Sequence, residues 1–196
     1  MPAHDDQSDS GQPVSGRVVV IEPLGIDDLS TVRYIHATSI RLHAAQVLSD
    51  DEIKAFTDHV YSDAYAGQLS RVRLFGARID GELVGTSGWS FGDDSASGAR
   101  ISSLHVRPLF TRIGIGHALL AAAEAAATVA GFDSFSARAT LNSVRFFEHH
   151  GYVVTSHGLY PMRPDVGLPV AFMRKAERAT DVVKVVVKAK AGVTTH

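Results

Sequence analysis

The sequence predicts an α/β (α+β) fold with six to seven strands and about four helices. Two kinds of pattern predict it. Apolar residues alternate with others on both sides of the Asp80-Gly81 pair, which is a strong signal for a β-hairpin turn. Elsewhere, apolar residues recur at helical spacing behind capping residues such as Ser49 and Glu52. The predicted order of elements is β-α-α-β-β-β-α-β-α-β-β.

The front of the domain is predicted to be a strand followed by two helices. Residues 17–21 (RVVVI) are typical of a short strand, which Pro23 ends. Asp27 and Asp28 favour the first turn of a helix, and Ser49 begins the second helix as part of a capping box. The apolar faces of the two helices are Leu29, Val32, Ile35 and His36, then Ile53, Phe56, Val60 and Ala64.

The rest of the chain alternates between strands and two further helices. Residues 92–98 (GDDSASG) are typical of a flexible connection. A helix over about 116–130 is stopped by Gly131, and Asn142 is expected to cap a short helix that Gly151 stops. The expected strands are 72–78, 83–91, 101–106, 134–140, 152–156 and 170–174, the last two separated by a Gly/Pro-rich loop.

The composition predicts one soluble, cytoplasmic domain. The 196 residues are 45% hydrophobic and 20% charged, and the net charge of −2 gives no general attraction to nucleic acid or an acidic membrane. No cysteine is present, which excludes disulfides, thiolate zinc sites and a cysteine nucleophile. No apolar run is long enough for a membrane span. Residues 1–16 are polar and acidic, so we expect a disordered tail before a domain over 17–175.

The C-terminal extension, 176–196, contains an unusual β-branched run over 181–190 (DVVKVVVKAK). Two interpretations stay open. The run forms an added edge strand whose lysines block further pairing, or it is a strand exchanged with a second protomer. The second interpretation predicts a homodimer.

Two spaced glycines stand directly before the alanine-rich helix, in the stretch VRPLFTRIGIGHALL (106–120). Gly114 and Gly116 leave the first N–H groups of that helix uncovered, and Arg112 adds a positive charge, so the loop favours a phosphate or pyrophosphate. The alternative is that the glycines only form a tight turn. A P-loop is excluded because no Gly-Lys-Ser/Thr triplet is present, and Leu119 stands where a dinucleotide motif needs a small residue.

Two motifs resemble those of the GNAT superfamily of N-acetyltransferases. A strand followed by VRP and TRIGIGHALL is similar to the family's acetyl-CoA-binding motif. NSVRFFEHHGY (142–152) is similar to its second signature, a helix with an aromatic pair, an acid and a Gly-aromatic end. The resemblance covers 17–175 and implies a mixed, mostly antiparallel central sheet. It also implies transfer of an acetyl group from acetyl-CoA to a primary amine of a small molecule or peptide.

The resemblance implies a cofactor site in three parts. N–H groups of the glycine loop cradle the CoA pyrophosphate, backbone groups of the strand before it hold the pantetheine arm, and Asn142 hydrogen-bonds that arm near an aromatic pair. The residues so implied are Leu104, His105, Val106, Thr111, Arg112, Ile113, Gly114, Ile115, Gly116, His117, Asn142, Phe146 and Phe147. The family usually has Gln or Arg at the position of Thr111, and often has Tyr at that of Phe147. This chain therefore lacks the tyrosine that can protonate the departing thiolate.

Acyl transfer needs a neutral amine and a stabilised oxyanion. His105 is the candidate catalytic base because an ordinary histidine titrates near neutral pH; the alternative is a polar residue that only lines the cleft. Ser102 and Ser103 are candidates for ordering water, and the N–H of Val106 is a candidate for holding the thioester oxygen. Tyr61 and Tyr65 share a predicted helix face, where they line an acceptor cleft or pack in the core.

No metal is expected, because His149 and His150 point about 100° apart on a helix and no HExxH motif is present. Two classes of function stay open. The first is an active N-acetyltransferase. The second is an acyl-CoA-binding module that senses the cofactor without turning it over, which the loss of the tyrosine at Phe147 favours.

Overall fold

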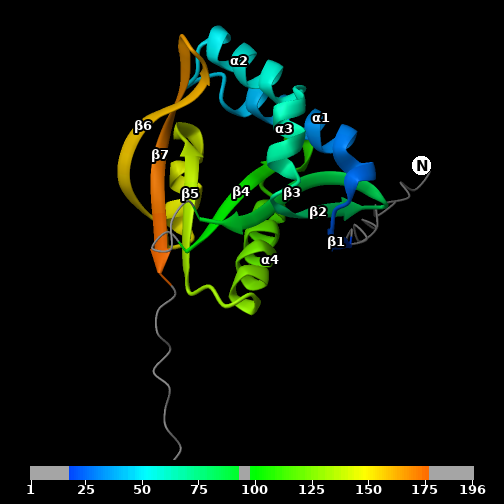
Figure 1. Ribbon diagram of the computed structural model, residues 1–196. Coiled ribbons are helices and arrows are strands. Elements are labelled where there is room, and N and C mark those ends of the chain that lie inside the picture. The colour runs from blue at the N-terminus through cyan, green and yellow to red at the C-terminus, as the bar shows by residue number, and fades with distance from the viewer. Residues whose placement is uncertain (1–17, 93–97, 177–196) are drawn as a thin grey trace, which may run out of the picture.

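Seven strands and five α-helices make up the parts of the chain that the computed structural model describes, residues 18–92 and 98–176 (Figure 1). The strands are β1 (Val19–Pro23), β2 (Arg73–Ile79), β3 (Glu82–Phe91), β4 (Ala99–Val106), β5 (Ser134–Thr140), β6 (Val153–Arg163) and β7 (Val166–Ala176). The helices are α1 (Leu29–His43), α2 (Asp50–Val60), α3 (Asp63–Leu69), α4 (Ile115–Val129) and α5 (Val144–His149).

The strands form one sheet in the order β1-β2-β3-β4-β5-β7-β6. Every neighbouring pair is antiparallel except β4 and β5, which are parallel. The predicted mixed, mostly antiparallel sheet is confirmed. The β2–β3 turn is the expected one, with Asp80 and Gly81 both at positive φ (52° and 81°), the pattern of a type I′ hairpin.

Helices cover both faces of the sheet. α1, α2 and α3 lie on one face, and α4 lies on the other (Figure 1). α5 is on the same face as α4, because Phe147 of α5 shares a buried cluster with Leu120 and Ala123 of α4. On the opposite face, Ile40 of α1 packs in a cluster with Val170 of β7. The α4 boundary is close to the prediction, with Gly131 (φ 95°) just beyond its end.

The parallel pair β4–β5 is short. Ala99, Arg100 and Ile101 pair with Phe135, Ser136 and Ala137, and no pairing follows along β4 in the described residues. The two strands therefore separate toward their C-terminal ends, while each keeps its antiparallel partner on the other side. The separation opens the sheet at its centre, where the residues of the glycine loop and α5 converge.

The second predicted helix is divided into two. α2 ends at Val60, and the Ser62 hydroxyl accepts a hydrogen bond from Tyr65 N (3.2 Å) to begin α3. The prediction of one continuous stripe through Ala64 is therefore wrong, because Ser62 is a better helix N-cap than a helix-interior residue. Tyr61 and Tyr65 do not share a helix face: Tyr61 is 53% exposed, whereas Tyr65 is 8% exposed.

Two further expectations are corrected. Asn142 does not cap a helix; it lies inside a short 3-10 turn, Leu141–Ser143, and the N-cap of α5 is Ser143. The expected Gly/Pro-rich loop is part of β6 and β7, which pair up to Arg163 and Val166. Proline is tolerated because β6 is an edge strand, and because Pro169 lies just beyond the last β5–β7 pair.

Three predicted segments lie outside the described residues: the N-terminal tail over 1–16, the centre of the 92–98 connection, and the strand over 181–190. The expectations about them, including the homodimer, stay predictions. None of the helices within 18–92 and 98–176 is long and apolar enough to cross a membrane.

Candidate active site

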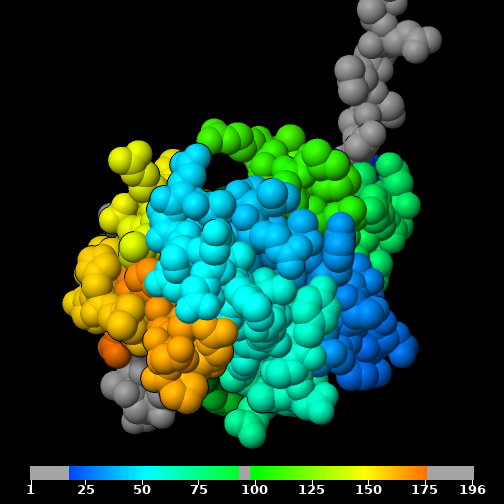
Figure 2. Space-filling view, turned by 90° about the horizontal axis from the view of Figure 1, so that it is seen from above, coloured from blue at the N-terminus to red at the C-terminus, as the bar shows by residue number. Residues whose placement is uncertain are grey.

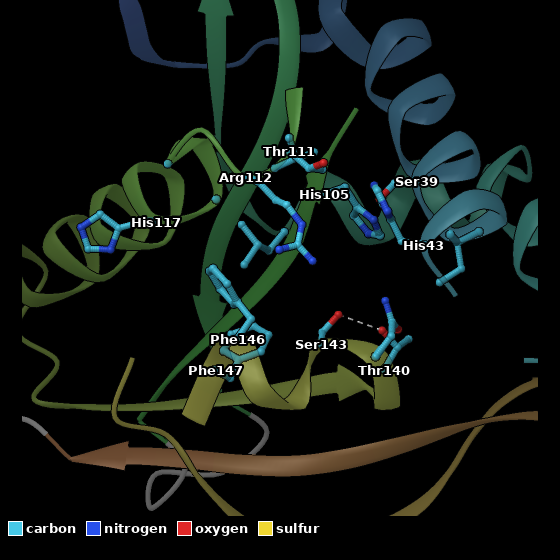
Figure 3. A pocket seen from close by; sticks show the side chains of 16 residues that line it. Ser39, His43, His105, Thr111, Arg112, His117, Thr140, Ser143, Phe146 and Phe147 are labelled. Carbon is cyan, nitrogen blue, oxygen red and sulfur yellow. Dashed lines mark hydrogen bonds between the residues drawn. The ribbon is translucent and has the colours of Figure 1, made fainter. Parts of the chain in front are cut away.

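A cavity of 450 Å³ lies where β4 and β5 separate. It is lined by the end of α1, the second half of β4, the glycine loop and the start of α5 (Figure 3). Of the residues predicted to bind the cofactor, the cavity brings together all except two; those on its wall are Leu104, His105, Val106, Thr111, Arg112, Gly114, Gly116, His117, Asn142, Phe146 and Phe147. The missing two are Ile113, which is exposed, and Ile115, whose side chain is buried in the core.

The glycine loop presents bare backbone to this cavity. Gly114 is the N-cap of α4 at φ 88°, and a Cβ built on it would meet nothing within 4 Å. Ala118 N donates to Gly114 O (3.0 Å) to start the helical hydrogen-bond ladder. The N–H groups of Ile115, Gly116 and His117 therefore precede the first N–H that donates within the helix, and they have no partner in it. This arrangement suits an anion, because the helix dipole adds partial positive charge at the same point.

Arg112 adds a full positive charge to the loop. Its backbone is in the left-handed region (φ 63°), and its side chain extends into the middle of the cavity, across from Phe146 (Figure 3). Among the described residues, the non-glycine positions with positive φ are Asp80 in the hairpin turn, Arg112 and Ser103. The last two border cavities, and strain of this kind, about 1 kcal/mol each, persists where the surrounding structure enforces it.

β4 carries a bulge beside the cavity. Thr86 of β3 pairs with His105 and Gly88 pairs with Ser102, so the single residue Ser87 opposes both Ser103 and Leu104. An extra residue of this kind disturbs the hydrogen-bond ladder and bends the strand. On its other side, β4 beyond Ile101 has no strand partner in the described residues. Its backbone groups therefore face the opening between β4 and β5, where an extended ligand can add as a strand does.

A second cavity, of 770 Å³, lies on the other side of this opening. It shares Leu104, His105 and Phe147 with the first cavity and extends between α2, α3 and the sheet. Figure 2 shows a hollow in the surface between the light-blue segment around the end of α1 and the green segment after β4. Two cavities that meet at His105 can hold two substrates with their reacting groups adjacent.

A family comparison identifies the domain. The model described as "Acetyltransferase (GNAT) domain" matches residues 44–163, which is more than half of the chain. The chain belongs to the GNAT acetyltransferase family. No curated protein matches it by sequence.

Solved structures show the same fold. A GCN5-related N-acetyltransferase from Rhodopseudomonas palustris superposes with a TM-score of 0.73 at 24% identity, covering 85% of this chain and 99% of the other. PaiA N-acetyltransferase from Thermoplasma acidophilum, in complex with coenzyme A, gives 0.66 at 21% identity, covering 81% and 99%. YncA from Salmonella typhimurium, with its cofactor acetyl-CoA, gives 0.57 at 16% identity, covering 91% and 99%.

In this GNAT domain, His105 is held among other aromatic rings. Its ring centroid lies 4.2 Å from that of His36 and 6.1 Å from that of Phe56. Burial, together with the nearby His43, lowers the pKa of His105 to about 4. Burial lowers the pKa of His36 well below its ordinary value. Both imidazoles are therefore neutral at pH 7, and each keeps one nitrogen lone pair.

Phe146 and Phe147 lie where the resemblance implied, but with different surroundings. Phe147 is 6% exposed, with its ring edge-on to Tyr152 at 5.1 Å, and it borders both cavities. Phe146 lines the first cavity and lies 3.4 Å from the Cβ position of Gly116. The Thr140 and Ser143 hydroxyls, 3.1 Å apart, are the polar groups beside this aromatic pair (Figure 3).

Sequence reasoning missed part of the wall. Ser39 and His43 of α1 and Thr140 and Ser143 near α5 line the first cavity, and the buried His43 Nε2 has no hydrogen-bond partner in the described residues. A signal was present, because His36, Ser39 and His43 recur at helical spacing on the face that α1 turns inward. No group of three or more His, Cys, Asp or Glu side chains gathers as a metal site within the described ranges, and the absence of a metal stays a prediction.

The neutral histidines make stability depend on pH. The pKa of His105 is about 4 when folded and about 6.5 when unfolded, so the unfolded chain binds more protons between these values. The contribution of these histidines to the free energy of unfolding is therefore fully present above about pH 6.5 and is lost as pH drops toward 4. Each such histidine changes the free energy of unfolding by about 1.4 kcal/mol per pH unit in this range. Urea unfolding from pH 7 to 4.5 measures this slope. His105→Asn is expected to make it shallower by one proton, and an unchanged slope would contradict the assignment.

Proposed function

We propose that this GNAT domain transfers the acetyl group of acetyl-CoA to a primary amine of a small molecule or peptide. The observation that carries the proposal is the continuity of the site. An anion cradle at Gly114 leads along the open edge of β4 to His105, where a second cavity begins. Membership of the family supports acetyl transfer, and the second cavity gives an acceptor a place beside the thioester.

The cofactor is proposed to bind with its pyrophosphate on the first N–H groups of α4 and near Arg112. Its pantetheine arm follows β4 at Leu104 and Val106, with Asn142 within the same cavity wall. The unpaired edge of β4 gives the amide groups of the arm backbone partners. In this position the thioester reaches the bulge, and an N–H of β4, such as that of Val106, is proposed to hold its oxygen.

The low pKa of His105 bears on how the amine loses its proton. Deprotonating an ammonium of pKa about 10.4 at pH 7 costs about 4.6 kcal/mol when solvent takes the proton. Transfer of the same proton to a base of pKa about 4 costs roughly 9 kcal/mol. The solvent route is cheaper. We therefore favour a role for His105 as a neutral hydrogen-bond acceptor at the meeting point of the two cavities, rather than as the base that removes the first proton.

The cofactor assignment predicts a loss of CoA binding in Gly114→Asp, because the added carboxylate occupies and repels the anion cradle. Gly131→Asp is the matched control: Gly131 stands at the other end of α4, also at positive φ (95°) and with open space around its Cβ position. Calorimetric titration with CoA is expected to show at least a hundredfold weaker binding for Gly114→Asp and near-wild-type binding for Gly131→Asp. Equal affinities in the two folded variants would refute the assignment.

The pH dependence of the rate tests the role of His105. With solvent removing the proton, kcat/KM is expected to rise about tenfold per pH unit from pH 6 toward the amine pKa, in wild type and in His105→Gln alike. His105→Gln keeps a polar side chain there and is expected to lower kcat/KM by less than about tenfold. Steady-state assays of thiol release give both values. A variant with a loss of 10³-fold or more and a flattened profile would make His105 the base after all.

Phe147→Tyr tests how the thiolate leaves. A thiol of pKa about 8.5 leaves without a general acid, so we expect wild type to be slow but active. The variant adds only a hydroxyl to a ring that already borders both cavities, and it is expected to raise kcat by up to about 10²-fold if the hydroxyl reaches sulfur.

Thiol release at saturating acetyl-CoA, across a panel of amines, measures the effect of Phe147→Tyr. An unchanged kcat would mean that another acid serves or that protonation does not limit the rate. If neither protein releases thiol in an amine-dependent way while both bind CoA, the chain is the acyl-CoA-binding sensor module and the proposed enzyme activity is wrong.

A further inference from the structure

A buried chain of hydrogen bonds connects the second cavity with the bulge of β4. Tyr65 Oη lies 2.6 Å from His36 Nδ1, and His36 Nε2 lies 2.8 Å from Thr86 Oγ1. Thr86 Oγ1 in turn donates to the Ser103 carbonyl oxygen at 2.7 Å. The four residues come from α3, α1, β3 and β4, and the side chains of His36 and Thr86 are fully buried.

The chemistry of these groups fixes the direction of every bond in the chain. Thr86 has one hydroxyl hydrogen, and the Ser103 carbonyl can only accept, so that hydrogen is donated to Ser103. Thr86 Oγ1 therefore accepts from His36, which places the imidazole hydrogen on Nε2. The bare Nδ1 then accepts from Tyr65 Oη. All the donors point toward the bulge, from Tyr65 to Ser103.

The Ser103 carbonyl is the point on which this chain converges. Ser103 has φ 57° in the middle of a strand, a conformation that serine rarely adopts. It is the first residue of the bulge, and Leu104 and His105, which follow it, are among the residues that line both cavities. The orientation of the Ser103 peptide therefore decides where the next N–H groups of β4 point.

We propose that Thr86, His36 and Tyr65 are positioning residues, which lock the Ser103 peptide in its left-handed conformation and so aim the N–H of Leu104, on the other side of that peptide, at the acyl group. This inference rests on the proposed function. The ring of His105 lies against that of His36, with centroids 4.2 Å apart and ring planes tilted by 33°, so it contacts the same hydrogen-bonded group. Because Tyr65 also lines the second cavity, these hydrogen bonds connect the wall of the proposed acceptor site to the bulge.

The alternative, a proton relay, does not fit the same geometry. A proton passed inward from Tyr65 would leave His36 charged, and burial disfavours that form. Onward transfer would end on the Ser103 carbonyl, which has no proton to release and is not a base at neutral pH. These hydrogen bonds hold the Ser103 peptide in place and carry no proton from one cavity to the other.

Thr86→Val tests the inference, because it replaces the hydroxyl by a methyl group of similar size. The expected result is a fall in kcat of about 10²-fold, the order of loss caused by small displacements of reacting groups, with KM for acetyl-CoA within about twofold of wild type. Thr86→Ser keeps the hydroxyl and is expected to restore most of kcat. Tyr65→Phe removes the first donor and is expected to lower kcat about tenfold.

Thr155→Val is the matched control. Thr155 Oγ1 donates to the Phe172 carbonyl oxygen (3.0 Å), which is also a threonine-to-strand-carbonyl bond, but it lies on the β6 edge away from both cavities. Its kcat is expected to match wild type. A crystal structure of each variant gives a second readout that needs no activity: φ of Ser103 is expected to leave the positive region in Thr86→Val and to keep it in Thr86→Ser and Thr155→Val.

These readouts separate the outcomes. A Thr86→Val protein with wild-type kcat, or one in which Ser103 keeps its positive φ, overturns the inference. So does a Thr86→Ser protein that is as impaired as Thr86→Val, since the hydroxyl would then not be the cause. If Thr86→Val does not fold, wild-type kcat in Tyr65→Phe overturns it. If wild type itself is inactive with all amines, the proposed function fails, and φ of Ser103 alone decides whether the chain of hydrogen bonds holds the bulge.

Discussion

The rest of the structure depends on the short pairing of β4 with β5. Parallel strands in a continuous sheet pair along their length, but here pairing covers only Ala99–Ile101 and Phe135–Ala137. The separation that follows removes a row of backbone hydrogen bonds from the centre of the protein. Such unpaired groups are costly when they are buried away from water, so the opening must stay accessible or be filled. It is the place inside the described sheet, away from the edge strands β1 and β6, where an extended ligand can bind without displacing a strand.

The two ends of this opening are shaped by backbone conformations with positive φ. At one end, the glycine loop reaches α4 through Gly114, whose positive φ needs no compensation. At the other end, Ser103 adopts positive φ without that freedom, and its carbonyl is held by Thr86 and, through it, by His36. The first solution is encoded within one loop, which contains Gly114 and Arg112. The second requires contacts between four elements of the fold.

This difference explains how far the sequence could predict the structure. Structures that depend on a few adjacent residues were predicted correctly. They are the Asp80-Gly81 turn, the Ser49 capping box and the glycine loop at the start of α4. Where a local signal competed with another, prediction failed, as when Ser62 divided the second helix. The hydrogen bonds from Tyr65 to Ser103 connect residues far apart in sequence, and one of them joins residues 50 positions apart. No local sequence pattern can therefore indicate them. The wall residues Ser39 and His43 were missed because cavities form only in the folded chain.

The distribution of charge along the opening limits how a ligand can enter it. Arg112, which is exposed, and the first N–H groups of α4 lie at the glycine-loop end of the opening, where positive charge attracts an anion. Inside, His36 and His105 are held neutral by burial, and Phe147 adds an apolar surface. A phosphate moved against these neutral and apolar side chains would lose solvation, at a cost of several kcal/mol. This distribution favours the proposed orientation of a ligand with a charged end and a long neutral arm, in which the charged end lies at the glycine loop and the neutral end at the bulge beside the second cavity.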